Sequence, residues 1–98
     1  MSLDPALHAP ARLQIAAVLA EVEEAEFARL ATIADVSDSV MSKHLKALSD
    51  EGYVKLKKAK SDGRQRTWAS FTKEGRKAFA AHMNALEELV ASARAAAE

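Results

Sequence analysis

Residues 37–71 read SDSVMSKHLKALSDEGYVKLKKAKSDGRQRTWASF, and the period of their hydrophobic pattern changes once, at Gly52. Before Gly52, apolar residues recur every three or four positions, at Met41, Leu45 and Leu48. At about 100° per residue they share one face of a helix, which Ser37 can cap and Gly52 can end. After Gly52 the pattern alternates, which is typical of a half-buried strand. The stretch therefore predicts a helix over 38–50 followed by β-structure.

A tight turn is predicted to join two strands within 53–71. Asp62-Gly63 is a strong signal for a two-residue type I′ hairpin turn, because both central residues must adopt positive φ. Counting back from this turn pairs Val54 with Phe71, Leu56 with Ala69, and Lys57 with Trp68. The first two pairs place apolar side chains on one face, as a one-sided sheet requires. The third pair lies on the other face, where we expect the lysine cation to contact the indole ring.

Two helices are predicted before residue 37. Apolar residues at spacings of three and four indicate a helix that begins near Pro10 and ends in the acidic stretch 21–26; they are Ile15, Val18, Leu19 and Val22. Asp4 and Pro5 could start an earlier turn, which residues 8–10 interrupt. A short second helix carries Phe27, Leu30, Ala31 and Ala34. We expect Asp35 to close it, because aspartate tolerates the left-handed conformation of a sharp turn.

The C-terminal segment, 78–98, is predicted to continue a long helix that Thr72 caps. Its apolar residues follow at spacings of 4, 3, 4, 3 and 4, as in a heptad repeat; they are Phe79, Met83, Leu86, Val90, Ala93 and Ala97. A helix of about 25 residues would be about 37 Å long, more than a small domain needs to cover its own core. We therefore expect Phe79, Met83, Leu86, Val90 and Ala93 to pair with a second subunit. The alternative is that the alanine-rich end frays.

Composition favours one mainly helical domain over residues 1–98. The chain has 98 residues, three glycines and two prolines, and 22 of its residues are alanine. It has no cysteine, which excludes a disulfide framework and a thiolate zinc site. No apolar run approaches the ~20 residues that cross a bilayer, and the N-terminus lacks a signal-peptide pattern. We expect a cytoplasmic protein without a membrane partner, mainly α with a small β-hairpin (α+β).

Charge is balanced over the whole chain but not along it. Fourteen Lys and Arg residues match fourteen Asp and Glu residues. Residues 37–77 nevertheless hold eleven bases against five acids, while both flanking segments are acidic. Such segregation lets one face attract a polyanion while the remainder keeps the molecule soluble. The alternative at this point is an ordinary solvated, lysine-rich hairpin.

The order of these elements and four short motifs resemble the MarR/ArsR-type bacterial winged helix-turn-helix transcriptional regulators. The motifs are MSKHLKAL (41–48), EGYV (51–54), RTW (66–68) and FTKEGR (71–76), and the resemblance covers roughly residues 3–80. It implies a winged helix-turn-helix fold in which helix 38–50 enters the major groove of double-stranded DNA. The hairpin 53–71, the wing, would flank the minor groove. Terminal helices would form a homodimer that reads a palindromic operator.

The outer face of helix 38–50 carries the predicted base contacts. Small residues and lysines allow a helix to approach base edges closely while cations meet phosphates. We expect base-edge contacts from Ser39, Ser42 and Lys43, a thymine-methyl contact from Val40, a phosphate contact from Lys46, and Ser37 within the same surface. His44 lies at the edge of the core stripe, where we expect it to pack and to donate a hydrogen bond within the protein or to phosphate.

The tip of the wing carries the remaining predicted contacts. Arg64, next to the turn, is expected to enter the minor groove, because a guanidinium suits a narrow electronegative groove. Lys60 and Arg66 are expected to meet the DNA backbone. Each of these residues could also be only a solvated surface residue, and Trp68 is expected to pack rather than to stack on a base.

Other functions find little support in the sequence. No phosphate loop, zinc-hydrolase motif or nucleophile-base arrangement is present, so we expect neither an enzyme nor a cofactor. His8 and His82 do not form a pair at helical ligand spacing, so no metal site is predicted. A small-molecule effector could still bind beneath the N-terminal segment, near His8 and the final helix. A protein-interaction winged helix without specific DNA binding remains the alternative function.

Overall fold

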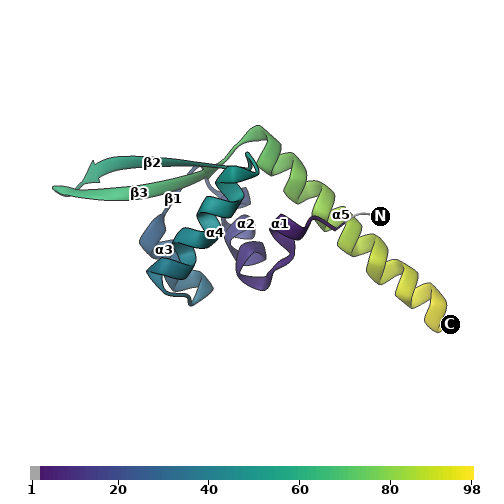
Figure 1. Cartoon of the computed structure of the whole chain (residues 1–98). Coiled ribbons are helices and arrows are strands. Elements are labelled where there is room, and N and C mark those ends of the chain that lie inside the picture. Colours follow the sequence, from purple (N-terminus) through teal and green to yellow (C-terminus); the bar gives the residue numbers. More distant parts are fainter. Residues whose placement is uncertain (1–2) are drawn as a thin grey trace.

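The computed structural model describes residues 3–98, which form a small helical body with two projections. The elements in chain order are α1 (Pro5–His8), α2 (Pro10–Glu21), β1 (Ala25–Glu26), α3 (Phe27–Ala34), α4 (Asp38–Asp50), β2 (Val54–Ser61), β3 (Arg64–Phe71) and α5 (Lys73–Ala97). The β2–β3 hairpin and the distal half of α5 leave the body in opposite directions (Figure 1), so the molecule measures 59 × 26 × 21 Å. No helix within the described range is both long and apolar enough to cross a membrane.

Helix α4 begins and ends where the sequence predicts. The hydroxyl oxygen of Ser37 accepts a hydrogen bond from the backbone N–H of Val40, with the two atoms 3.3 Å apart. Gly52 follows the helix with φ of 81°, a conformation that glycine adopts without steric cost. Asp35 turns the chain between α3 and α4 with φ of 54°, in the left-handed region expected for it.

The hairpin has the predicted register throughout. Asp62 and Gly63 have φ values of 53° and 75°, as a type I′ turn requires. The strands pair Val54 with Phe71, Leu56 with Ala69, and Lys57 with Trp68. The predicted contact between Lys57 and the ring of Trp68 is replaced by an ion pair, because Glu24 lies 3.2 Å from the lysine Nζ. Among the described residues, the cation over an aromatic ring is Arg76, whose Cζ lies 5.9 Å from the centroid of Phe71.

A third strand, β1, was not predicted. The sheet order is β1-β3-β2 and both pairings are antiparallel, with Ala25 opposite Ala69 and Glu26 opposite Trp68. Two residues are too few to show alternation, and their acidic neighbours resemble the end of helix α2. Strand β1 exists because β3 offers an edge some forty residues further along the chain, which local patterns cannot reveal. Val22, expected inside helix α2, instead follows it and is 37% exposed.

The first turn forms the four-residue helix α1, which ends at His8 where the interruption is expected, and it contributes to the core. The carboxylate of Asp4 caps it by accepting from the N–H of Ala6, and Leu7 is fully buried. The Tyr53 hydroxyl donates to the other Asp4 oxygen at 2.6 Å. This hydrogen bond, with burial, raises the pKa of Tyr53 to about 12. The N-terminal segment is therefore tied to the turn between α4 and β2.

One compact core joins all the helices to the sheet. Its largest fully buried apolar side chains are Leu7, Ile15, Leu19, Leu30, Met41, Leu45 and Leu48, and Val54, Ala69 and Phe71 close it from the sheet. Arg76 joins α5 to the end of α2 by donating to the carbonyl oxygens of Ala20 and Val22. Helix α4 contributes only one face to this core, so its other face lies at the surface.

Candidate nucleic-acid interface

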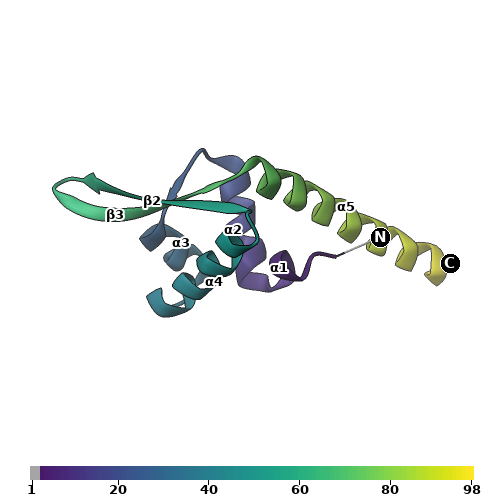
Figure 2. The same ribbon diagram turned by 45° about the horizontal axis from the view of Figure 1, so that its top comes forward.

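The outer face of α4 is open to solvent. Exposed positions along it are Ser37, Ser39, Val40, Ser42, Lys43 and Lys46, while Met41, Leu45 and Leu48 on the opposite face are buried. Helix α4 crosses in front of the helical body, and α1 and α5 lie away from its outer face (Figures 1 and 2). Within residues 3–98, the terminal segments therefore do not cover this face.

Polar contacts along this face are weak. Lys46 Nζ lies 3.1 Å from the carboxylate of Asp50, but the two side chains are 74% and 66% exposed. An exposed pair of this kind contributes between zero and about 1 kcal/mol, so Lys46 can exchange it for another anion. The hydroxyl oxygens of Ser37 and Ser39 lie 3.4 Å apart. The hydroxyls and two lysines of this face can therefore bind another molecule without breaking a strong contact within the protein.

His44 connects this helix to the N-terminal helices. Its Nδ1 accepts a hydrogen bond from Arg12 Nε at 3.1 Å, and Arg12 Nη1 donates to the carbonyl oxygen of Ala6. Since arginine can only donate, Nδ1 is the acceptor and Nε2 carries the proton of neutral His44; donation from Nε2 stays a prediction. Burial and then the Arg12 charge lower the pKa of His44, because both disfavour the imidazolium. His44 fixes the base of α4 in its neutral form.

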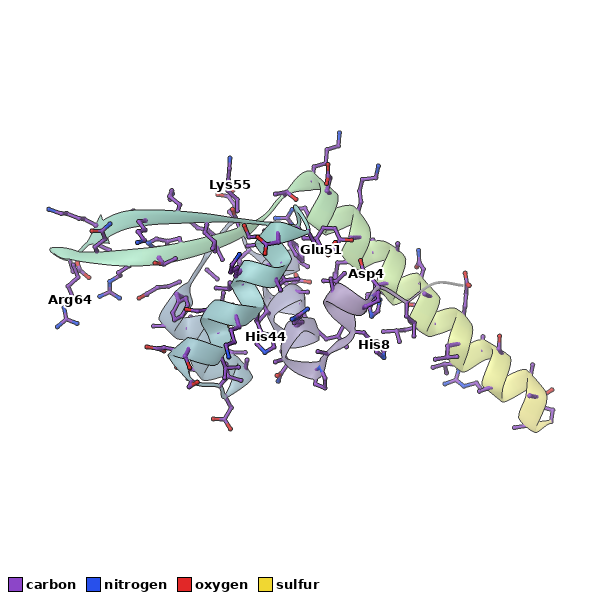
Figure 3. The ribbon with its side chains drawn as sticks, in the orientation of Figure 1. Asp4, His8, His44, Glu51, Lys55 and Arg64 are labelled. Carbon is purple, nitrogen blue, oxygen red and sulfur yellow. The ribbon has the colours of Figure 1, made fainter. Side chains whose placement is uncertain are left out.

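The wing carries its cations toward a free tip. Lys60 and Arg64 are exposed there, as are Lys55 and Lys58 nearer the body. Figure 3 shows Arg64 at the far end of the hairpin, extending toward the side on which α3 and α4 lie, whereas Lys55 extends the opposite way. The predicted minor-groove residue is therefore free to reach a ligand that also contacts α4.

Arg66 differs from the other wing cations because its ion pair is sheltered from solvent. Its Nη1 lies 2.7 Å from Glu26 Oε1, and the two side chains are only 30% and 23% exposed. Arg66 Nε is buried and has no hydrogen-bond partner among the described residues. Sequence patterns could not find this pair, because Glu26 reaches the wing only through the unpredicted strand β1.

Two histidines that are far apart in sequence meet between α1 and α5. His82 is buried, and its Nε2 lies 3.3 Å from His8 Nδ1. Because the backbone N–H of Asp4 donates to His82 Nδ1 at 2.9 Å, neutral His82 carries its proton on Nε2 and donates it to His8. Residues 3–98 contain no group of three potential metal ligands. The pair is thus a hydrogen-bonded clip, beside a shallow hollow lined by Leu3, Asp4, Pro5, Tyr53, Ala78, Ala81 and His82.

The heptad positions of α5 divide between two environments. Phe79 packs against the core, with its ring centroid 6.1 Å from that of Phe71, and is only partly buried, so its pairing with a second subunit stays a prediction. Met83 and Leu86 are half-buried, Val90 is 47% exposed, and every residue from 87 to 98 is exposed. A second hollow runs along this outer part and is lined by Met83, Leu86, Glu87, Val90, Ala91 and Arg94. We call Met83, Leu86, Val90 and Ala93 the terminal seam.

The fold is similar to that of known transcriptional regulators. A family model described as a winged helix DNA-binding domain matches residues 11–90. The uncharacterized protein MJ0432 of Methanocaldococcus jannaschii is 37% identical over 68 residues, which span 69% of this chain and 74% of that protein.

Among solved structures, a transcriptional regulator homologue from Pyrococcus horikoshii OT3 superposes with a TM-score of 0.82 at 25% identity, covering 89% of this chain and 86% of that one. A MarR family transcriptional regulator from Silicibacter pomeroyi superposes with a TM-score of 0.69 at 27% identity, covering 88% and 56%. These matches confirm the MarR/ArsR-type resemblance and the winged helix fold. The chain therefore belongs to the family of winged helix DNA-binding domains, whose structural neighbours are transcriptional regulators.

Proposed function

We propose that this protein is a transcriptional regulator that binds double-stranded DNA sequence-specifically as a homodimer. Helix α4 enters the major groove, where Ser39, Ser42 and Lys43 contact base edges, and Val40 contacts a thymine methyl. The wing lies along the minor groove, which Arg64 enters, while Lys46 and Lys60 contact phosphates. Ser37 and His44 support the helix at its N-terminus and base.

A single observation carries this proposal: the small, basic face of α4 is uncovered, on the same molecule as an exposed cationic wing tip. Ser39, Ser42 and Lys43 are exposed, and so are Lys60 and Arg64. A helix fits the major groove of B-DNA only if its outer face is free and its side chains are short or flexible. Both conditions hold here, and the fold belongs to a DNA-binding family.

The homodimer is supported by the terminal seam. Apolar residues line the outer face of a helix segment in which every residue from 87 to 98 is exposed. A protein of Mycobacterium bovis with the same fold, 24% identical and with a TM-score of 0.70, is described as a homodimeric winged helix-turn-helix domain. Two copies would place two α4 helices for two half-sites of one operator.

Salt dependence tests DNA binding itself. Duplexes selected by the protein from genomic fragments and random duplexes are titrated by fluorescence anisotropy at several salt concentrations. If several phosphates per subunit are neutralised, the logarithm of affinity falls linearly with the logarithm of salt, by about 10³-fold or more between 50 and 200 mM for a dimer. Weak binding without salt dependence would contradict the proposal and favour a protein-interaction module.

Three alanine variants test the assigned roles. Lys43→Ala should lose about 1–3 kcal/mol of discrimination between selected and random duplexes, because it removes a base contact. Lys60→Ala should weaken both duplexes alike, because phosphates carry no sequence information. Lys77→Ala, an exposed lysine on α5, is the matched control and should change neither. Equal effects of Lys43→Ala on both duplexes would refute the assignment of α4 as the base-reading helix.

A further inference from the structure

Two acidic residues before α3 hold two of the wing's cations. Glu24 is paired with Lys57 and Glu26 with Arg66. The Glu26–Arg66 pair is the shortest of the three ion pairs within residues 3–98 and the most sheltered, with side chains 23% and 30% exposed. Lys46–Asp50 on α4 is far more exposed. Of the two paired wing cations, Arg66 is therefore the one whose charge is compensated in a sheltered position, since the Lys57–Glu24 pair is 60% and 43% exposed.

Strand β1 holds the Glu26 carboxylate in place. Its backbone pairs with β3, which puts Glu26 directly opposite Trp68, and Arg66 lies two residues from Trp68 on the same face of the sheet. Burial of Arg66 Nε shows that the guanidinium is packed against the protein rather than extended into solvent. The pair is thus positioned by sheet hydrogen bonds and not by two mobile surface side chains.

A carboxylate and a phosphate compete for the same guanidinium donors. Arginine presents a rigid fork of N–H groups that fits either anion. A partly buried ion pair is screened by salt less than an exposed one, so a DNA phosphate at the surface displaces it less readily. Glu26 therefore occupies the donors through which Arg66 would otherwise meet the DNA backbone.

We propose that Glu26 is an internal counter-ion that withholds Arg66 from DNA and so limits the sequence-independent attraction of the wing. The inference rests on the proposed DNA-binding function and identifies Glu26 as a residue outside the contact surface that sets the sequence-independent part of the affinity. Each phosphate contact strengthens binding to every duplex alike, so an additional contact raises the affinity for the many non-specific sites that compete for the protein and adds no discrimination. Arg66 becomes a phosphate-binding cation only when the charge of Glu26 is removed.

The test compares Glu26→Gln with Glu23→Gln on random duplexes. Glu23 is exposed in the same acidic segment, so both variants remove one negative charge from the same region. Glu26→Gln should bind random DNA more tightly at low salt. The slope of log affinity against log salt concentration, called the salt slope here, should steepen by about 0.9 per subunit. This equals an additional loss of about three- to fourfold per subunit between 50 and 200 mM salt. Glu23→Gln and the charge-retaining Glu26→Asp should keep the wild-type slope.

Arg66→Gln provides the second arm. In the Glu26→Gln background it should return the slope to the wild-type value, because the freed cation is gone. Alone, it should leave the slope unchanged, since Arg66 makes no phosphate contact in the wild type. Three results would overturn the inference. One is a steeper salt slope in Glu23→Gln, and another is a steeper slope in Glu26→Gln that persists when Arg66→Gln is added. The third is a shallower slope in Arg66→Gln alone. Failure of the proposed function is separate, because wild-type protein would then show no salt-dependent duplex binding.

Discussion

At the scale of single residues, half-buried polar groups are held in the protonation states that their hydrogen bonds require. Asp4, as a carboxylate, accepts from Tyr53 and raises the pKa of that phenol to about 12. His44 is held neutral between burial and the Arg12 guanidinium. Such groups stabilise the fold only in one protonation state, because each hydrogen bond requires a donor on one side and a lone pair on the other.

The lowered pKa of His44 predicts that the protein loses stability in mild acid. Its pKa is lowered in the folded state, so its contribution is fully present above the unfolded value of about 6.5 and is lost as pH falls through the folded pKa. NMR titration of the imidazoles should give His44 a midpoint below 6.5, and unfolding free energy should fall between about pH 7 and pH 5. His44→Gln should make that fall shallower. A midpoint at or above 6.5 would contradict the assignment.

At the scale of elements, the approach of α5 to the α4–β2 turn determines where the sheet sits. Thr72 caps α5 and also donates to the carbonyl oxygen of Gly52, so one side chain serves two elements. The backbone at Gly75 then passes so close to Tyr53 that a Cβ atom would lie 2.1 Å from its carbonyl oxygen. The glycine is required by this contact between elements and not by its own φ.

Gly75→Ala should therefore destabilise the protein, although alanine favours helix. An added Cβ must displace the backbone of Tyr53 or the ring of Phe71, and overpacking of this kind costs about 1–3 kcal/mol. Urea unfolding followed by circular dichroism should show a lower midpoint at an unchanged m-value. Lys77→Ala, at an exposed position of the same helix, is the control. A midpoint at or above the wild-type value would show that the two elements move apart at no cost.

At the scale of the whole molecule, the chain is elongated and measures 59 × 26 × 21 Å, because two parts of it project from the helical body. The core occupies the helical body, while the wing and the outer half of α5 extend from opposite sides (Figure 1). The two projections suit partners of different kinds: the cationic wing suits a polyanion, and the terminal seam suits a second apolar helix. The proposed dimer on DNA satisfies both.

Val90→Glu should dissociate the proposed dimer. Val90 is 47% exposed in the isolated chain, and a charge placed there would be buried without a partner in a helix pair. Sedimentation equilibrium at micromolar protein should show a dimer for the wild type and a monomer for this variant. Ser92→Glu, exposed on the other side of α5, should remain dimeric. A wild-type monomer would remove the two-half-site arrangement while leaving the fold intact.

Local patterns predicted the elements that carry the proposed site. The caps at Ser37 and Thr72, the turn at Asp62-Gly63 and the strand register are all as expected, because each depends on residues close in sequence. The open face of α4 also follows from the helical spacing of its apolar residues. Met41, Leu45 and Leu48 are buried on one face, and the polar residues of the opposite face are left exposed.

Contacts between distant segments lay beyond such patterns. Strand β1, the Glu26–Arg66 pair, the His8–His82 clip and the bond from Arg12 to His44 join residues that are 32 to 74 positions apart. Hydrophobic periodicity and capping act over a few residues, so they specify helices, strands and turns along the chain. Which side chains then meet depends on how those elements pack, and packing alone turns Arg66 from an exposed cation into one held by its own protein.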